Sequence, residues 1–95
     1  MAVLSYLRLA IEEEVLPEFQ RDLGEMLRLA RGRPGLQWAQ LLGDGENPNV
    51  HVVLSQWEAV EDIRAWEHSP QHEAIMQKYD PHYAEEVIHR RYSPL

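Results

Sequence analysis

The sequence predicts a single domain of the α+β class. Two observations support this prediction: short apolar stretches typical of strands alternate with segments in which apolar residues recur three or four positions apart, as in helices. The 95 residues contain no internal repeat, low-complexity run or linker, so residues 1–95 should form one domain. A domain this small buries only roughly 60–70% of the surface of its unfolded chain, so association with a second chain would stabilise it.

The first predicted element is a strand over residues 2–11. Its apolar residues have few polar interruptions, so we expect both faces of this strand to be covered. Three glutamates follow, and over residues 16–30 apolar residues then repeat at helical spacing. Pro17 suits the first turn of this helix, and Gly32 and Pro34 end it. The segment therefore predicts one amphipathic helix of about four turns.

A hairpin follows, formed by strands over residues 36–42 and 50–57. The segment between them is dense in turn-forming residues, and the second strand is rich in valine. Strict alternation of side chains would place Leu36 and Trp38 on one side of the first strand and Leu41 on the other.

Two short helices are predicted between residues 60 and 79, separated by Ser69 and Pro70. Serine is a good N-cap and proline suits the first helical position, so one helix should stop near His68 and the next should start at once. One face of the second helix carries the residues at i, i+3, i+4 and i+7, namely His72, Ile75, Met76 and Tyr79. The side chain of His72 should therefore point inward.

The last predicted strand spans residues 84–92, where apolar residues stand among charges, as at a sheet edge or an interface. The order of elements is then β-α-β-β-α-α-β, the ferredoxin-like split βαβ sandwich. Helices cover one face of such a sheet, whereas the predicted strands are apolar on both faces. We therefore expect a homodimer whose sheets pack face to face.

Composition limits the possible partners. Sixteen acidic and nine basic residues give a formal net charge of −7, which disfavours nucleic acid and anionic membrane surfaces. No stretch approaches the roughly 18 apolar residues of a membrane-spanning helix, and the first residues lack the basic start of a signal peptide. Zero cysteines leave no disulfide framework and no thiolate nucleophile. We expect a cytoplasmic protein that binds neither nucleic acid nor membranes.

His72 is the candidate for proton transfer, because it is the titratable residue on the buried stripe and small shifts change the charge of histidine near neutral pH. The alternative is a core histidine whose ring is satisfied by hydrogen bonds. His68 and His72 have the spacing of metal ligands on a continuous helix, but Ser69 and Pro70 interrupt that helix and disfavour a metal site. Nucleotide-binding and serine-hydrolase motifs are absent from the sequence, so we expect no cofactor.

Tryptophans are candidates to line a ligand cavity, because small-molecule pockets combine aromatic walls with a few polar groups. Trp38, Trp57 and Trp66 are equally compatible with core packing, and Trp66, beside the helix break, is the first candidate. The hydroxyls of Tyr6 and Tyr79 are able to donate to a substrate oxygen if they face it, and are otherwise solvated.

Three parts of the sequence resemble a known family. Residues 33–36 (Arg-Pro-Gly-Leu) lead into a strand, Trp57 ends another, and residues 63–72 read Ile-Arg-Ala-Trp-Glu-His-Ser-Pro-Gln-His. Together they resemble the antibiotic biosynthesis monooxygenase (ABM) domain, over about residues 3–92. The resemblance implies a dimeric α+β barrel in which each subunit holds a pocket between its helices and its sheet.

The resemblance also implies a function. Oxygenases of this family act without metal, flavin or haem on electron-rich phenols or quinols, whose deprotonated form reduces dioxygen. The chain would then be a cofactor-independent monooxygenase in which His72 is the base and Trp66 is a wall of the pocket. Trp38, Tyr79 and Leu7 would shape the cavity around the substrate. The sequence does not identify the donor that would stabilise an oxyanion.

Two alternatives stay open. Many members of the superfamily have no demonstrated activity, so the chain is also compatible with a non-catalytic dimer, structural or binding a small apolar or aromatic ligand, with Trp66 and His72 in its core. A related branch degrades haem with a first-strand asparagine, a helix tryptophan and a histidine nine or ten residues further on. Trp66 matches that pattern, but the other positions fall at Leu7 and at Ile75 or Met76, which disfavours haem.

Overall fold

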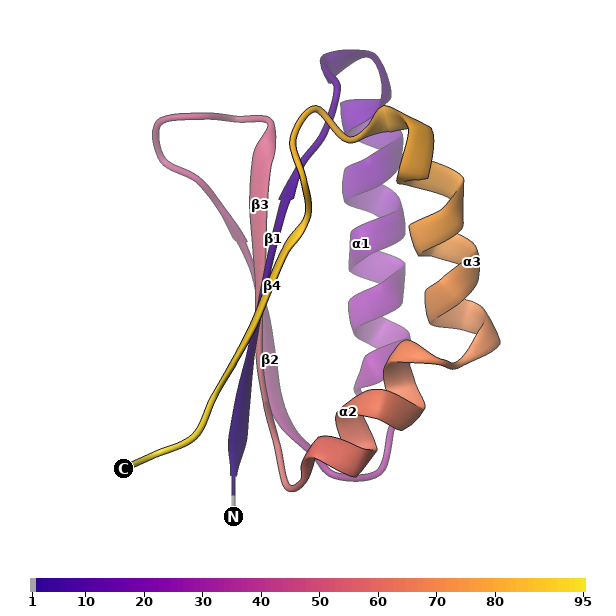
Figure 1. Cartoon of the computed structure of the whole chain (residues 1–95). Helices are drawn as coiled ribbons and strands as arrows, with labels where there is room; N and C mark the ends of the chain where they lie inside the picture. The colour runs from indigo at the N-terminus through magenta and orange to yellow at the C-terminus, as the bar shows by residue number, and fades with distance from the viewer. Residues whose placement is uncertain (1) are drawn as a thin grey trace.

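The structure, a computed structural model, describes residues 2–95. Its main elements are β1 (Val3–Ala10), α1 (Leu16–Ala30), β2 (Leu36–Gly43), β3 (Val50–Trp57), α2 (Val60–Glu67), α3 (Pro70–Tyr79) and β4 (Ile88–Tyr92). Two 3-10 turns, η1 (Glu13–Val15) and η2 (Asp80–His82), precede α1 and follow α3. The predicted order of elements and the ferredoxin-like fold are confirmed (Figure 1).

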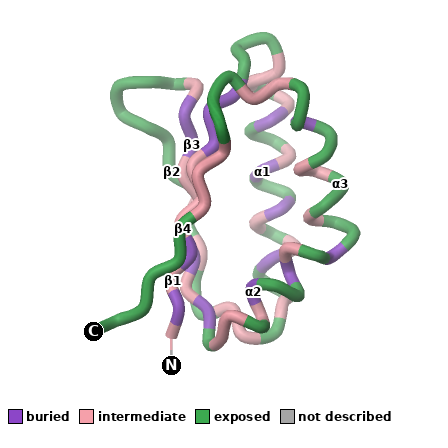
Figure 2. Tube along the Cα trace, viewed as in Figure 1, coloured by how far each residue is buried: buried purple, intermediate pink, exposed green. Residues whose placement is uncertain are grey.

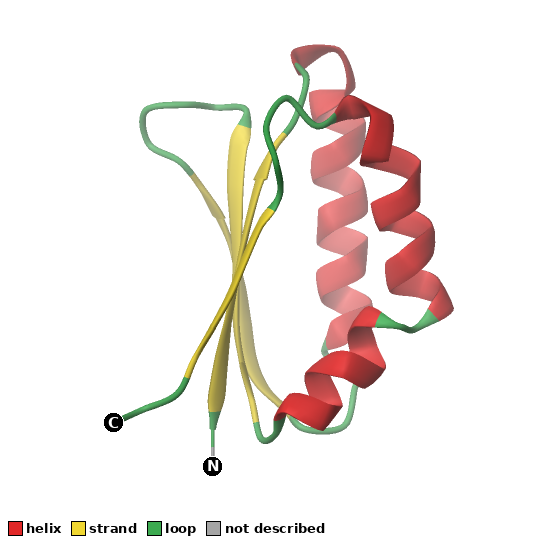
Figure 3. Ribbon diagram, viewed as in Figure 1, coloured by secondary structure: helices red, strands yellow, loops and turns green. Residues whose placement is uncertain are grey.

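The four strands form one antiparallel sheet in the order β2-β3-β1-β4. All three helices lie on the same side of this sheet, with α1 and α3 next to each other and α2 near one end (Figures 1 and 3). Strand β4 begins at Ile88, four residues later than predicted, because the chain bends at Ala84 and Glu85 before it joins β1. Strand β1 therefore lies between β3 and β4 and pairs with both of them.

The hydrophobic core lies between the helices and the sheet. Helix α1 is amphipathic, and its buried residues recur at helical spacing: Phe19, Leu23, Met26 and Ala30. They belong to one cluster with Leu9 of β1, Trp57 of β3 and Ile63 of α2. Figure 2 shows buried positions on the inner side of α1 and along the central strands, whereas the outer parts of α3 are exposed.

Among the described residues, no helix lies on the other face of the sheet (Figure 3). Side chains alternate along a strand, so the residues that neighbour the core positions point away from the helices. We call this surface the helix-free face, and its large apolar residues are Leu4, Tyr6, Trp38, Leu42, Val52, Leu54, Ile88 and Tyr92. Trp38 is 40% exposed and Tyr92 is 52% exposed.

A bulge in β2 corrects one prediction. The register of β2 against β3 shifts between Leu36, which lies opposite Trp57, and Trp38, which lies opposite Gln56. The extra residue reverses the side on which the following side chains point. Leu36 therefore faces the helices together with Leu41, and Trp38 faces away from them, whereas strict alternation predicted that Leu36 and Trp38 share a side. Among residues 2–95, no helix has the length and apolar character needed to cross a bilayer.

Candidate active site

Two small cavities lie next to each other between the helices and the sheet. The first has a volume of about 30 Å³ and the second of about 40 Å³. Five residues line both cavities, namely Met26, Val53, Ser55, Trp57 and Trp66. A change in the side chain of Met26 or Trp66 would therefore alter both spaces together.

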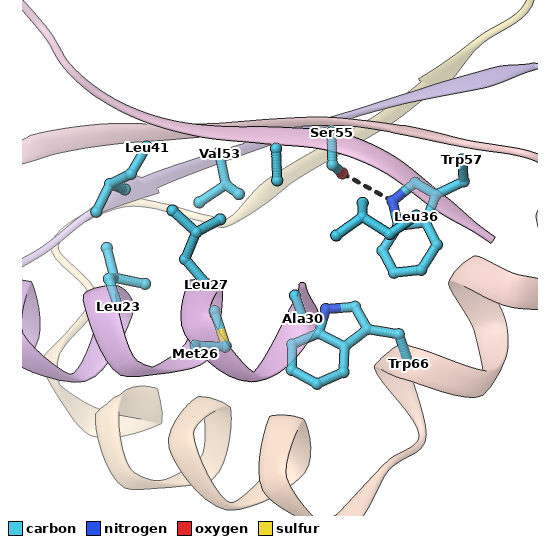
Figure 4. A pocket seen from close by; sticks show the side chains of 11 residues that line it. Leu23, Met26, Leu27, Ala30, Leu36, Leu41, Val53, Ser55, Trp57 and Trp66 are labelled. Atoms are coloured by element: carbon cyan, nitrogen blue, oxygen red, sulfur yellow. Dashed lines mark hydrogen bonds between the residues drawn. The ribbon is translucent and has the colours of Figure 1, made fainter. Parts of the chain in front are cut away.

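The first cavity is almost entirely apolar. Figure 4 shows Leu23, Leu27 and Ala30 of α1 facing strands β2 and β3 across it. Its main polar contact is internal, because Trp57 Nε1 donates to Ser55 Oγ over 2.9 Å. The first cavity therefore offers a ligand mainly hydrocarbon and aromatic surface.

The second cavity has an apolar wall and a polar edge. Leu7, Ile63 and Trp66 contribute to the apolar wall. The polar side chains that line this cavity are Ser5, Ser55, Glu67, His72 and His89. A cavity with an aromatic wall and convergent polar groups is the usual form of a small-molecule site.

The break between α2 and α3 positions Trp66 and His72. Ser69 Oγ donates to the Trp66 carbonyl over 2.7 Å, which ends α2. The same oxygen accepts a hydrogen bond from the His72 backbone N–H at 3.3 Å, which caps α3. The two rings then meet edge to face, with centroids 5.2 Å apart and planes at 77°. One serine therefore fixes both residues at the cavity.

His72 is electrostatically suited to accept a proton. Burial lowers the pKa of His72 below its ordinary value of 6.5, and the Glu67 carboxylate opposes this change. His89 lowers the pKa of His72 as well, because a positive charge there would repel one on His72. The His72 imidazole is consequently neutral at neutral pH and has a lone pair available for a proton.

A polar network closes the second cavity at the β4 side. His89 Nε2 lies 3.2 Å from Glu67 Oε2 and 3.3 Å from Ser5 Oγ. The other Glu67 oxygen, Oε1, accepts a hydrogen bond from Arg91. The network joins the end of α2 to β1 and β4, so three elements hold its geometry.

Ser5, Glu67 and His89 were not predicted as site residues. The sequence contains one weak signal, because alternation along the last strand places His89 and Arg91 on the same side. The pairing of Ser5 with Arg91 and of Leu7 with His89 depends on the register of β1 and β4, which the sequence does not specify.

The structure brings together three of the five predicted site residues. Leu7, Trp66 and His72 line the second cavity. Trp38 lies on the helix-free face and lines neither cavity, contrary to its predicted place in the pocket. Tyr79 also lines neither cavity, since it is buried in the core with its ring edge to face on Phe19 at 4.9 Å.

The hydroxyl of Tyr79 already has a partner. It donates to Asp22 Oδ2 over 2.5 Å, and burial together with this bond raises the pKa of Tyr79 to about 12. Tyr79 therefore supports the packing of α3 on α1.

The two residues that stand where haem-degrading proteins have their histidine, Ile75 and Met76, also face the core. Ile75 and Met76 are half-buried against the hydrophobic cluster. His68 lies at the surface, with Nδ1 3.6 Å from Glu73. Within residues 2–95, no three histidine or carboxylate groups lie close enough together to hold a metal ion.

Solved structures with the same fold come from several organisms. Rv0793 from Mycobacterium tuberculosis has a TM-score of 0.91 and 14% identity, over 100% of this chain and 96% of that one. A conserved protein from Methanosarcina mazei Go1 has a TM-score of 0.90 and 15% identity, over 97% and 91% of the two chains. SnoaB from Streptomyces nogalater, a cofactor-independent oxygenase, has a TM-score of 0.84 and 15% identity, over 99% and 93%.

The structural similarity establishes the fold alone at these identities, and no curated protein matches the sequence significantly. The family is established by sequence, because the profile of the antibiotic biosynthesis monooxygenase family matches residues 3–78, which form most of the domain and include the Trp66–His72 segment. The chain therefore belongs to the antibiotic biosynthesis monooxygenase family.

Proposed function

We propose that the protein is a monooxygenase that oxidises a hydroxylated aromatic compound, a phenol or quinol, without a cofactor. The observation that carries this proposal is the neutral, half-buried imidazole of His72 against the Trp66 ring at the second cavity. Membership of the family and the likeness to SnoaB, a cofactor-independent oxygenase, support the same reaction class.

The proposed reaction begins with proton transfer. The substrate O–H bond breaks, His72 takes the proton, and the electron pair stays on the phenolate oxygen, from which it delocalises into the aromatic ring. The electron-rich anion then reduces dioxygen and forms a carbon–oxygen bond, giving a ring hydroperoxide. Loss of water from the hydroperoxide leaves a quinone, with one oxygen of O2 in the product and the other in water. The substrate supplies all four electrons, so the balance requires no further reductant.

The cavities must enlarge to admit an aromatic ring. Their volumes of about 30 and about 40 Å³ are far below the several hundred Å³ typical of ligand sites. Met26 lies in the wall between them, and methionine adapts its shape readily because it is unbranched and has three rotatable bonds. A substrate ring would lie between Trp66 and Leu7 of strand β1. The hydroxyl of the substrate would point toward the polar edge of the cavity.

The proposed functional unit is a homodimer joined through the helix-free face. That face exposes Trp38, Leu42 and Tyr92 beside the half-buried Leu4, Tyr6 and Leu54, and apolar residues grouped in this way on a surface are typical of protein–protein interfaces. A second copy presents the same surface and buries it by two-fold symmetry. Trp38 then has a role in assembly, in place of its predicted role in the pocket.

Oxygen consumption tests the activity. We expect the wild-type protein to consume O2 with 1,5-dihydroxynaphthalene, an electron-rich phenol with an unsubstituted para carbon. His72→Ala should lower the rate roughly 10²–10⁴-fold, the usual contribution of a general base, at an unchanged melting temperature. The matched control is His68→Ala, which removes an exposed histidine four residues away and should keep the rate.

The same experiment separates the enzyme from a non-catalytic structural dimer. The small volumes of the cavities favour the structural dimer, because no aromatic ligand fits them without a rearrangement. If His72→Ala lowers the melting temperature by several degrees and the wild-type protein consumes no O2, Trp66 and His72 are core residues and the oxygenase proposal is wrong.

A further inference from the structure

Two hydrogen-bond donors converge at the β4 edge of the second cavity. Ser5 and His89 stand on the neighbouring strands β1 and β4 and point to the same side of the sheet. Their Oγ and Nε2 atoms are 3.3 Å apart, and Ser5 is only 7% exposed. A hydroxyl and an imidazole N–H that meet in a buried place can both donate to one ligand oxygen.

The Glu67 carboxylate determines which group His89 presents. An ionised carboxylate only accepts hydrogen bonds, so its oxygen 3.2 Å from His89 Nε2 requires a hydrogen on that nitrogen. His89 Nε2 thus has Glu67 Oε2 and Ser5 Oγ as its neighbours, and because all three residues line the second cavity, a ligand oxygen there would share the N–H with Glu67. Arg91 binds the other Glu67 oxygen and neutralises the carboxylate, which reduces its repulsion of an anion nearby.

We propose that Ser5 and His89 form an anion-binding pair that holds the oxygen of a deprotonated phenolic ligand in the second cavity. The proposal rests on the proposed function, since the ligand class is the one named there. It supplies the oxyanion donors that the sequence does not identify. Fixed donors aimed at a developing charge in a cavity with little water contribute strongly to such a reaction.

The two histidines then have different tasks at one site. His72, half-buried against Trp66, accepts the proton of the ligand hydroxyl, and His89, hydrogen-bonded to Glu67, donates to the oxygen that remains. The O–H bond of the ligand breaks and an N–H bond forms on His72, while the charge left on the oxygen stays between Ser5 and His89. The two imidazoles have different neighbours, the Glu67 carboxylate at His89 and the Trp66 ring at His72, and these neighbours assign the roles.

A coloured phenol tests the pair without any turnover. 4-Nitrophenol absorbs visible light as the phenolate and not as the phenol, so its colour reports the form that is bound. At a pH where free 4-nitrophenol is mainly the phenol, binding to the wild-type protein should produce the phenolate colour. The groups around His89 that carry charge or titrate include Glu67, His72, Arg90 and Arg91, so every variant is compared at that one pH.

Substitutions identify the donors. His89→Leu should lower the ratio of bound phenolate to bound phenol roughly tenfold or more, and Ser5→Ala should lower it several-fold, as expected for hydrogen bonds to a charged group. His89→Gln keeps an N–H donor and should restore part of the ratio, which guards against a general effect on folding. His82→Leu is the matched control, because it removes another imidazole 3.2 Å from a carboxylate, that of Glu12, away from the cavity. We expect the control to leave the ratio unchanged.

The outcomes separate this proposal from the oxygenase. A His89→Leu protein that binds the probe with the wild-type ratio overturns the anion-binding pair, even if the wild-type protein consumes O2. A wild-type protein that takes up only the uncoloured phenol, or binds no 4-nitrophenol up to its solubility, overturns it too. Phenolate binding that depends on His89 in a protein without oxygen uptake supports the pair and refutes the oxygenase.

Discussion

Trp66 and His72 meet edge to face with ring centroids 5.2 Å apart, although they belong to two different helices. On one continuous helix, residues six apart point to different sides. The break at Ser69 and Pro70 changes the direction of the chain and returns His72 to the tryptophan. The catalytic proposal therefore depends on the geometry of this break.

Ser69→Ala should destabilise the fold and disturb the site together. The substitution removes the cap on the His72 N–H and the bond to the Trp66 carbonyl, so we expect a loss of about 0.5–2 kcal/mol in the free energy of unfolding. Urea unfolding measures this loss. Ser69→Asp keeps an N-cap acceptor and should lose less, whereas equal losses for both variants would show that capping is unimportant here.

Two glycines should respond to alanine in opposite directions. Gly35 joins α1 to β2 with φ of 85°, and a Cβ there would overlap the Asp62 carboxylate, so Gly35→Ala should cost at least about 2 kcal/mol. Gly24 lies inside α1 with open space around it, so Gly24→Ala should stabilise by about 0.5–1 kcal/mol. Thermal unfolding of the two variants measures the direction of each change in stability. A stabilised Gly35→Ala protein would contradict the turn geometry.

Stability should fall as the pH drops through about 6.5, the ordinary pKa of histidine. Burial lowers the pKa of both His51 and His72 in the folded protein, so the unfolded chain binds more protons in this range. The loss begins near the unfolded pKa and levels off below the lowered folded values. Urea midpoints measured from about pH 7.5 to about pH 5.5 test this, with His51→Gln expected to flatten the curve. A flat wild-type curve would contradict the burial of neutral histidines.

Trp38→Asp should dissociate the proposed homodimer. The substitution places a charge on the helix-free face, and burying that charge against a second copy costs a few kcal/mol. Light scattering should then return a particle of 11.1 kDa, where the wild-type protein gives about twice that mass. Ala74→Asp adds the same charge on the outer surface of α3 and should leave the dimer intact. A folded wild-type monomer at micromolar concentration would remove the basis of the proposed assembly.

The order of elements was predictable because each carries a local signal. The apolar repeat of α1 and the Ser69–Pro70 break both specify structure over a few residues. The face of Trp38 was not predictable, because a single-residue bulge reversed the alternation and the sequence does not mark bulges. Tyr79 was placed on the correct helix face, but only the packing of α3 on α1 directs its hydroxyl to Asp22.

The polar edge of the site required the tertiary structure. Ser5, Glu67 and His89 are 22 to 84 residues apart in sequence, and sheet register with the end of α2 brings them together. Local patterns identify Trp66 and His72 because both lie next to the helix break. A contact made by strand pairing has no comparable local signal.

Isotopic labelling of the product tests the central claim most directly. With 1,5-dihydroxynaphthalene and ¹⁸O₂, a monooxygenase of the proposed kind forms a hydroxynaphthoquinone that carries one labelled oxygen, and the second labelled oxygen appears in water. We predict this labelled product for the wild-type protein and almost none of it for His72→Ala. A quinone without label, or hydrogen peroxide formed in an amount equal to the oxygen consumed, would contradict the proposed reaction.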